Sequence, residues 1–100
     1  MTMLDVMASR VVYAARVFER AVHDPGPWFI EYQGVRFPAM RVCEQDRVTF
    51  TADLPIQETG FITVGLHCGD ELLSVRELTV EQVFEDGLAI DWAVELTTVA

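Results

Sequence analysis

The sequence predicts a mainly β protein, an antiparallel β-sandwich or small barrel of about six strands with one N-terminal α-helix. Three observations carry this prediction. Apolar residues recur at helical spacing up to residue 23, prolines then interrupt the pattern, and apolar and polar residues alternate with a period of two afterwards. A chain of 100 residues is expected to form a single domain over 1–100, with a helix over 3–23 packed on a β body over 28–98.

The segment 3–23 is predicted to be helical because one stripe collects its apolar residues Leu4, Met7, Ala8, Val11, Ala15, Phe18 and Val22. The prolines of 24–27 are expected to end the helix, because proline disfavours helix before it and donates no hydrogen bond within it. Val6, Tyr13 and Val17 form a second apolar patch away from this stripe. The patch is either wrapped by the domain itself or docks another subunit, and both interpretations stay open.

The first two predicted strands, 28–32 and 35–42, are joined by Gln33-Gly34, a pair that suits a tight hairpin because glycine supplies positive φ. Pro38 lacks an N–H group, so its strand is expected to lie at a sheet edge or to carry a bulge. Trp28 and Phe29 point to opposite faces of their strand, so one of them is expected to leave the main core.

Alternation predicts further strands over 48–54, 61–68, 72–78 and 88–96, with a turn at Gly69-Asp70. Thr79 to Gln82 fits a capping box, which indicates a helical turn, but a continuous strand fits nearly as well. If the strands of Thr51, Asp53, Asp91 and Glu95 are neighbours, these residues form an acidic sheet face.

The charge distribution limits the classes of partner that the chain is expected to bind. The net charge is −9, with +1 on residues 1–23 and −10 on residues 24–100. An acidic surface repels phosphate, so direct nucleic-acid binding is not expected. No apolar run is long enough to predict membrane insertion, and the N-terminus lacks the basic region of a secretory signal. We therefore expect synthesis in the cytoplasm.

The candidates for chemistry are few, and we predict no catalytic, metal or cofactor site. His67, Cys68 and Asp70 lie together at a strand end, but His67 and Cys68 point to opposite faces of a strand. Cys68 is in phase with apolar neighbours and is expected in the core, while Asp70 suits a turn. Cys43 and Cys68 are the two cysteines, and a disulfide between them is not expected in a protein without a secretory signal.

The segments 47–55 (RVTFTADLP) and 60–66 (GFITVGL) stand in a chain whose basic residues are all Arg, with neither Lys nor Asn. In these two segments and in this composition the chain, over roughly 28–96, resembles small β-rich virion proteins of tailed phages that infect actinobacteria. The resemblance implies a capsid decoration or tail protein, usually a symmetric oligomer, made in the host cytoplasm and carried in the virion. It carries over no individual functional residue.

Three functions remain as hypotheses. The first is a non-enzymatic structural subunit that associates with itself or with other structural proteins. Its candidate interface residues are Val6, Arg10, Tyr13, Val17, Trp28 and Phe29. The second is an acidic inhibitor or nucleic-acid mimic that blocks a basic partner, supported by the charge of residues 24–100. The third is a ligand-binding barrel or small enzyme, which the short length and the missing catalytic constellation disfavour.

Overall fold

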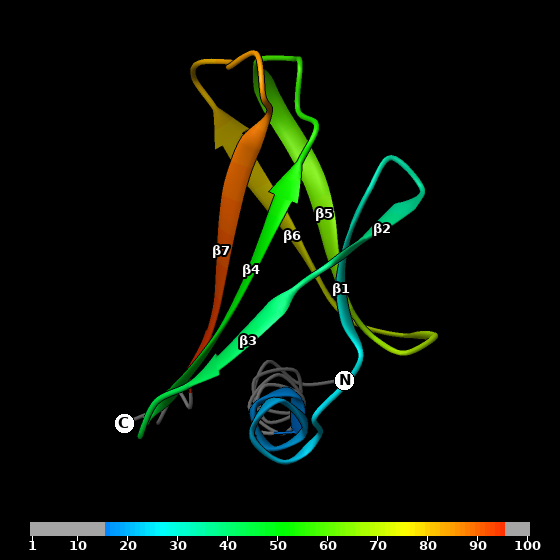
Figure 1. Ribbon diagram of the computed structural model, residues 1–100, viewed down its shortest axis with the longest axis vertical. Coiled ribbons are helices and arrows are strands. Elements are labelled where there is room, and N and C mark those ends of the chain that lie inside the picture. The colour runs from blue at the N-terminus through cyan, green and yellow to red at the C-terminus, as the bar shows by residue number, and fades with distance from the viewer. Residues whose placement is uncertain (1–15, 96–100) are drawn as a thin grey trace, which may run out of the picture.

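The computed structural model describes residues 16–95, which form seven strands in two antiparallel sheets next to a helical segment at 16–23 (Figure 1). One sheet has the order β2-β1-β5-β6 and the other the order β3-β4-β7. The strands are β1 (Trp28–Tyr32), β2 (Val35–Pro38), β3 (Met40–Cys43), β4 (Arg47–Leu54), β5 (Gly60–Cys68), β6 (Glu71–Val80) and β7 (Leu88–Glu95). The predicted fold class, a mainly β sandwich with one helix, is confirmed.

The core lies between the inner faces of the two sheets, where β1, β4 and β7 turn every second side chain inward. β1 follows this rule along its whole length, with buried and half-buried residues in strict alternation. Trp28 of one sheet contacts Phe50 of the other, with ring centroids 4.4 Å apart. The largest side chains that are almost fully buried are Trp92, Phe50, Ile30, Leu54, Ile56, Leu66, Val48 and Val64.

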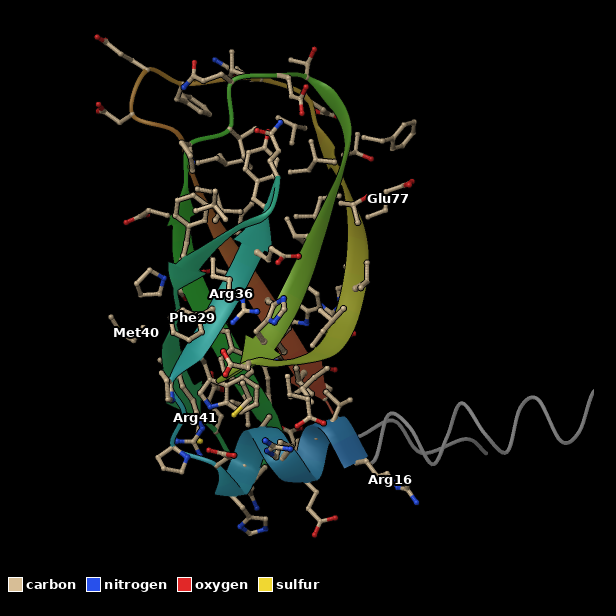
Figure 2. All side chains as sticks on the ribbon, turned by 90° about the vertical axis from the view of Figure 1, so that its right-hand side faces the viewer. Arg16, Phe29, Arg36, Met40, Arg41 and Glu77 are labelled. Carbon is tan, nitrogen blue, oxygen red and sulfur yellow. The ribbon has the colours of Figure 1, made fainter. Side chains whose placement is uncertain are left out.

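The helical segment ends at residue 23 and covers one end of the sandwich (Figure 1). Its side chains Val17 and Ala21 belong to the core. Arg41 of β3 lies beside the helix (Figure 2) and donates from Nε to the Ala21 carbonyl, at 2.6 Å, and from Nη2 to the Val22 carbonyl. Since the last carbonyls of a helix have no partner within it, this guanidinium supplies the missing donors. The predicted helical residues 3–15 lie outside the described residues.

The β1–β2 hairpin turns at Gln33 and Gly34, as predicted. Both residues have positive φ, 52° and 78°, which is the geometry of the tight hairpin turn that matches the twist of its strands. β2 is an edge strand, in agreement with the position of Pro38. The single strand predicted over 35–42 is divided, because β2 ends at Pro38 and β3 begins in the other sheet. Between them, the Ala39 N–H donates to the Trp28 carbonyl at 2.9 Å.

Two further segments are decided by the structure. Of the two possibilities at Thr79 to Gln82, a helical turn and a continuous strand, the strand is observed as far as Val80, and residues 81–84 have no regular structure. The β5–β6 hairpin turns at Gly69-Asp70 as predicted, but it carries an irregularity in register at Leu66/His67. Over residues 16–95, no helix is both long and apolar enough to cross a membrane.

Candidate interaction surfaces

The predicted interface residues fall into three groups. Val6, Arg10 and Tyr13 lie outside the described residues. Val17 and Trp28, with 8% and 3% of their surface exposed, are instead buried in the core of the chain, so they present no free surface. Phe29 is half-buried and lies on the outer face of the β2-β1-β5-β6 sheet, which we call the outer face. The expectation that one of Trp28 and Phe29 leaves the main core therefore holds for Phe29.

The outer face carries exposed apolar side chains beside polar ones. Phe61, Leu72 and Val75 point outward from β5 and β6, and so do Thr63, Glu77 and Thr79. The strand registers align Phe29, His67 and Leu72 in one row across β1, β5 and β6, and Gly65 and Val75 in the next. Phe61, Val75 and Leu72 are 75%, 56% and 50% exposed. Figure 2 labels Phe29, Arg36 and Glu77 of this sheet.

His67 is buried although it points to the outer face, with only 4% of its surface exposed. Its Nε2 lies 3.5 Å from Glu31 Oε1, at the outer limit of hydrogen bonding, and neither ring nitrogen has a hydrogen-bond partner among the described residues. Gly65 makes room for this arrangement, since a Cβ there would lie 3.0 Å from Leu72 Cδ1 and 3.7 Å from His67 Nε2. Water is therefore already excluded from the centre of the outer face.

The three candidates for chemistry are not brought together. Cys68 is a buried core residue, as predicted, and burial raises the pKa of its thiol. Asp70 is exposed in the β5–β6 turn, where its Oδ1 accepts from Arg36 Nη1 at 3.0 Å. A thiol with a raised pKa is a poor nucleophile, and the carboxylate that lies near it is Asp24.

Asp24 organises the turn that follows the helix. Its Oδ1 accepts from the Gly26 N–H at 2.9 Å and its Oδ2 from Arg20 Nε at 2.7 Å. These two donors hold the pKa of Asp24 at about 2, with the Gly26 N–H as the larger cause. The Asp24 carbonyl accepts from Trp28 Nε1 at 2.8 Å, which ties the turn to the core. The role of Asp24 is thus structural.

The acidic sheet face predicted on the other sheet exists only in part. β4 and β7 are neighbours, and Thr51 is paired with Asp91, to which its hydroxyl donates at 2.9 Å. Glu95, however, is neutralised by Arg47, whose Nε lies 2.9 Å from its Oε1. Carboxylates and an arginine therefore alternate on this face, and they form no continuous row of negative charge.

The loop between β6 and β7, residues 81–87, presents two more exposed apolar side chains, Val83 and Phe84, at 38% and 49% exposure. Its conformation is fixed: the Phe84 carbonyl accepts from Gly87 N and Gln57 Nε2, each at 3.1 Å. Gly87 has φ +86°, and a Cβ there would lie 2.3 Å from the Leu54 carbonyl oxygen. Only glycine lets the loop approach the end of β4 this closely.

A groove of about 490 Å³ lies between the helical segment and the start of β6. Its lining combines apolar and charged side chains: Arg16, Val17, Glu19, Arg20, His23, Glu71, Leu72 and Leu73. Sequence reasoning missed both this groove and the loop at 81–87. The adjacent Val83-Phe84 in an otherwise polar loop was a signal that could have found the latter.

Among residues 16–95, no group of three or more His, Cys, Asp or Glu side chains is arranged to hold a metal ion. No protein-family model, no curated protein and no solved structure matches the chain. Function must therefore be argued from the surfaces themselves.

Proposed function

We propose that the protein is a non-enzymatic assembly subunit that works through protein–protein contacts, first of all with further copies of itself. The observation that carries this proposal is the apolar character of the outer face. Phe61, Leu72 and Val75 are all at least half exposed on the two adjacent strands β5 and β6. Exposed apolar patches on a folded domain mark sites of association.

The charges at the margins of the outer face fit a contact between two copies. Arg36 lies on the edge strand β2 and Glu77 on the opposite edge strand β6, which also carries Leu72 and Val75. If two outer faces stack about a two-fold axis that lies between them and parallel to their strands, β2 of each copy lies over β6 of the other. Arg36, which pairs with Asp70 in its own chain, would then face Glu77 of the second copy. Such a contact uses the same patch on both subunits, as in most symmetric dimers.

Burial of His67 supports the same surface. Removing water from the two unpaired ring nitrogens of His67 costs free energy. A sheet face that only had to remain in contact with water would gain no stability from burying this side chain. Phe29 and Leu72 flank His67 in the strand registers and Glu31 lies 3.5 Å from its ring, so this imidazole is already dehydrated before any partner binds. Less water then has to be removed on association.

The test is sedimentation and light scattering of the wild-type protein and of Val75→Arg. Val75 points outward and is 56% exposed, so the fold should tolerate arginine. We expect a wild-type oligomer that persists in about 1 M salt, where the screening length is about 3 Å, and a smaller species for Val75→Arg. Ala89→Arg, at an exposed position of the other sheet, is the matched control and should assemble normally. A wild-type protein that is monomeric at every concentration refutes the proposal.

We further propose that the assembly is part of a phage virion, as a capsid decoration or tail protein. The support is the resemblance in the segments 47–55 and 60–66, together with the small β-rich fold. The chain should then be recovered with purified particles of the phage that encodes it, and its absence from them would contradict this setting.

The alternative, an acidic inhibitor or nucleic-acid mimic, has less support from the geometry. A mimic needs free carboxylates in rows, whereas Asp70, Glu71 and Glu95 are paired with arginines of the same chain. It predicts a monomer or dimer that binds a basic protein with strong salt dependence, so an assembly larger than a dimer that persists in salt would count against it in the same sedimentation experiment.

A further inference from the structure

The central strands of the outer face carry a histidine and a carboxylate side by side. His67 of β5 is buried, and neither of its ring nitrogens has a hydrogen-bond partner among the described residues. Its Nε2 lies 3.5 Å from Oε1 of Glu31 on β1, and the Glu31 side chain keeps 35% of its surface exposed. A histidine changes its charge between about pH 5 and pH 8, so these two groups form an ion pair only when the ring is protonated.

The side chains that flank His67 in the sheet are mostly apolar. The register places Leu72 of β6 on one side of it and Phe29 of β1 on the other. Glu31 follows Phe29 on the same face of β1, and Cys68, the next residue of β5, points to the opposite face. Glu31 is therefore the charged group that the strands beside His67 bring to its ring.

The arginine next to Glu31 is already engaged. Arg36 of the edge strand β2 is aligned with Glu31 in the register. Its Nη1, however, donates to the Asp70 carboxylate at 3.0 Å, in the turn that follows β5. This guanidinium does not have to be displaced from Asp70 if His67 supplies the positive charge for Glu31.

The carboxylates of β6 lie apart from this pair. Glu71 accepts from Arg20 of the helical segment at 2.8 Å. Glu77 is aligned with Thr63, further along the sheet, and lies in the contact proposed above opposite Arg36 of the second copy. Neither group replaces Glu31 as the partner of the imidazole.

The two-fold contact of the outer face would cover this pair in both copies. In the sheet order β2-β1-β5-β6, an axis parallel to the strands places β1 of each copy over β5 of the other. The exposed part of Glu31 then loses its water, and the Glu31 carboxylates of the two copies approach each other near the axis. A dehydrated carboxylate without a positive partner is unfavourable, and a second negative charge nearby makes it more so.

Protonation of His67 offsets this cost. The protonated Nε2–H can donate to Glu31 Oε1, so a hydrogen-bonded ion pair is covered in place of an isolated carboxylate. The associated state therefore binds protons more readily than the separate copies. By linkage, association strengthens as the pH falls through the range in which histidine titrates and weakens as the pH rises through it.

We propose that the Glu31–His67 pair is a pH-sensitive switch of the outer-face contact, which forms as His67 takes up a proton. This inference rests on the proposed assembly function and names its regulation. It also gives a reason for burying an imidazole without hydrogen bonds, because the ring is held beside the carboxylate before a second copy binds.

The experiment is sedimentation equilibrium of the full-length wild-type protein at about pH 6 and about pH 8, at one ionic strength. We expect a dimerisation constant about tenfold or more larger at the lower pH, since one proton taken up per dimer changes it tenfold per unit of pH. His67→Gln, which cannot become charged, should associate at both pH values as weakly as the wild type does at the higher one. His23→Gln removes an exposed histidine of the helical segment and is the matched control, with the wild-type dependence on pH.

A second variant leaves the buried ring in place. Glu31→Gln changes a half-buried side chain, and its amide needs no positive partner when water is removed. We expect it to associate more strongly than the wild type at the higher pH and to respond little to pH. Asp53→Asn removes the same charge from an exposed position of the other sheet, so it should keep the wild-type dependence. Circular dichroism verifies that each variant is folded.

The outcomes separate the switch from the assembly itself. A wild-type dimerisation constant that is equal at the two pH values overturns the switch, while the assembly function stands. A dependence on pH that persists in His67→Gln or in Glu31→Gln overturns it as well, and if His67→Gln does not fold, Glu31→Gln decides alone. A wild-type protein that is monomeric at both pH values refutes the assembly function and the switch together.

Discussion

Arg41 attaches the helix to the sheet, and its removal allows a quantitative test. Its Nε donates to the Ala21 carbonyl at 2.6 Å and its Nη2 to the Val22 carbonyl, in a half-buried position. A hydrogen bond to a charged group contributes about 1.5–3 kcal/mol net. A cation at a helix C-terminus adds about 0.3–1 kcal/mol. Water can partly replace the guanidinium, so we take the low end and expect Arg41→Met to cost about 2–3 kcal/mol.

The assay is urea unfolding followed by circular dichroism, at one fixed protein concentration because assembly raises apparent stability. Methionine keeps the apolar stem of the arginine but donates no hydrogen bond. For a chain of this size the loss corresponds to about 10–20 °C in Tm. Arg41→Lys retains the charge but lacks the fork that reaches two carbonyls, so it should recover about half of the loss.

Arg47→Met is the matched control. Arg47 pairs with Glu95 at 2.9 Å, but both side chains are about half exposed, and an exposed ion pair contributes about 0–1 kcal/mol. If Arg41→Met and Arg47→Met unfold within about 0.5 kcal/mol of each other, which is the scale of an ordinary surface substitution, the helix is not held by Arg41 and the argument fails.

Three further outcomes are expected. Because the pKa of Asp24 is held at about 2, the stabilisation it gives is complete above its unfolded-state pKa and is lost as the pH falls towards 2; thermal melts of Asp24→Asn should fall less steeply with pH than those of the wild type. Gly34→Ala, at φ +78° in open space, should lower the free energy of unfolding by about 1–2 kcal/mol. Gly87→Ala should lower it clearly more, because its Cβ would also overlap a carbonyl oxygen of β4, and equal losses in urea unfolding would contradict this close approach. A thiol reagent should modify exposed Cys43 promptly and buried Cys68, whose pKa is raised, only after unfolding; two equally fast thiols would mean that Cys68 is accessible.

The strands and turns could be predicted from the sequence where a single local physical rule determines the structure. Alternation predicted β4 nearly to its ends, because one of its faces is buried and the other is wet. Gln33-Gly34 predicted the first hairpin, because few residue pairs accept two positive φ angles. The end of the helix followed from the prolines of 24–27.

The misses arose where distant parts of the chain meet. For the patch that contains Val17, the sequence left open whether the domain wraps it or another subunit docks on it. Val17 packs onto the core, and no local pattern of the sequence could decide between the two. The burial of His67 depends on Leu72 of the next strand and on the missing side chain of Gly65. The groove joins residues some fifty positions apart in the sequence, so periodicity along the chain could not predict it.

The passage of the chain from β2 to β3 has a mechanical consequence. One uninterrupted stretch, residues 35–43, pairs with β1 in the first sheet and with β4 in the second, and the bond from Ala39 N–H to the Trp28 carbonyl anchors the crossing. A shear force that slides one sheet over the other must therefore stretch this covalent link, in addition to disrupting the side-chain packing between the sheets. The sandwich is expected to resist sliding more strongly along this side than along the opposite side, where β6 and β7 are linked by the loop 81–87 and by the hydrogen bond from Arg76 Nη2 to the Ala93 carbonyl at 2.7 Å.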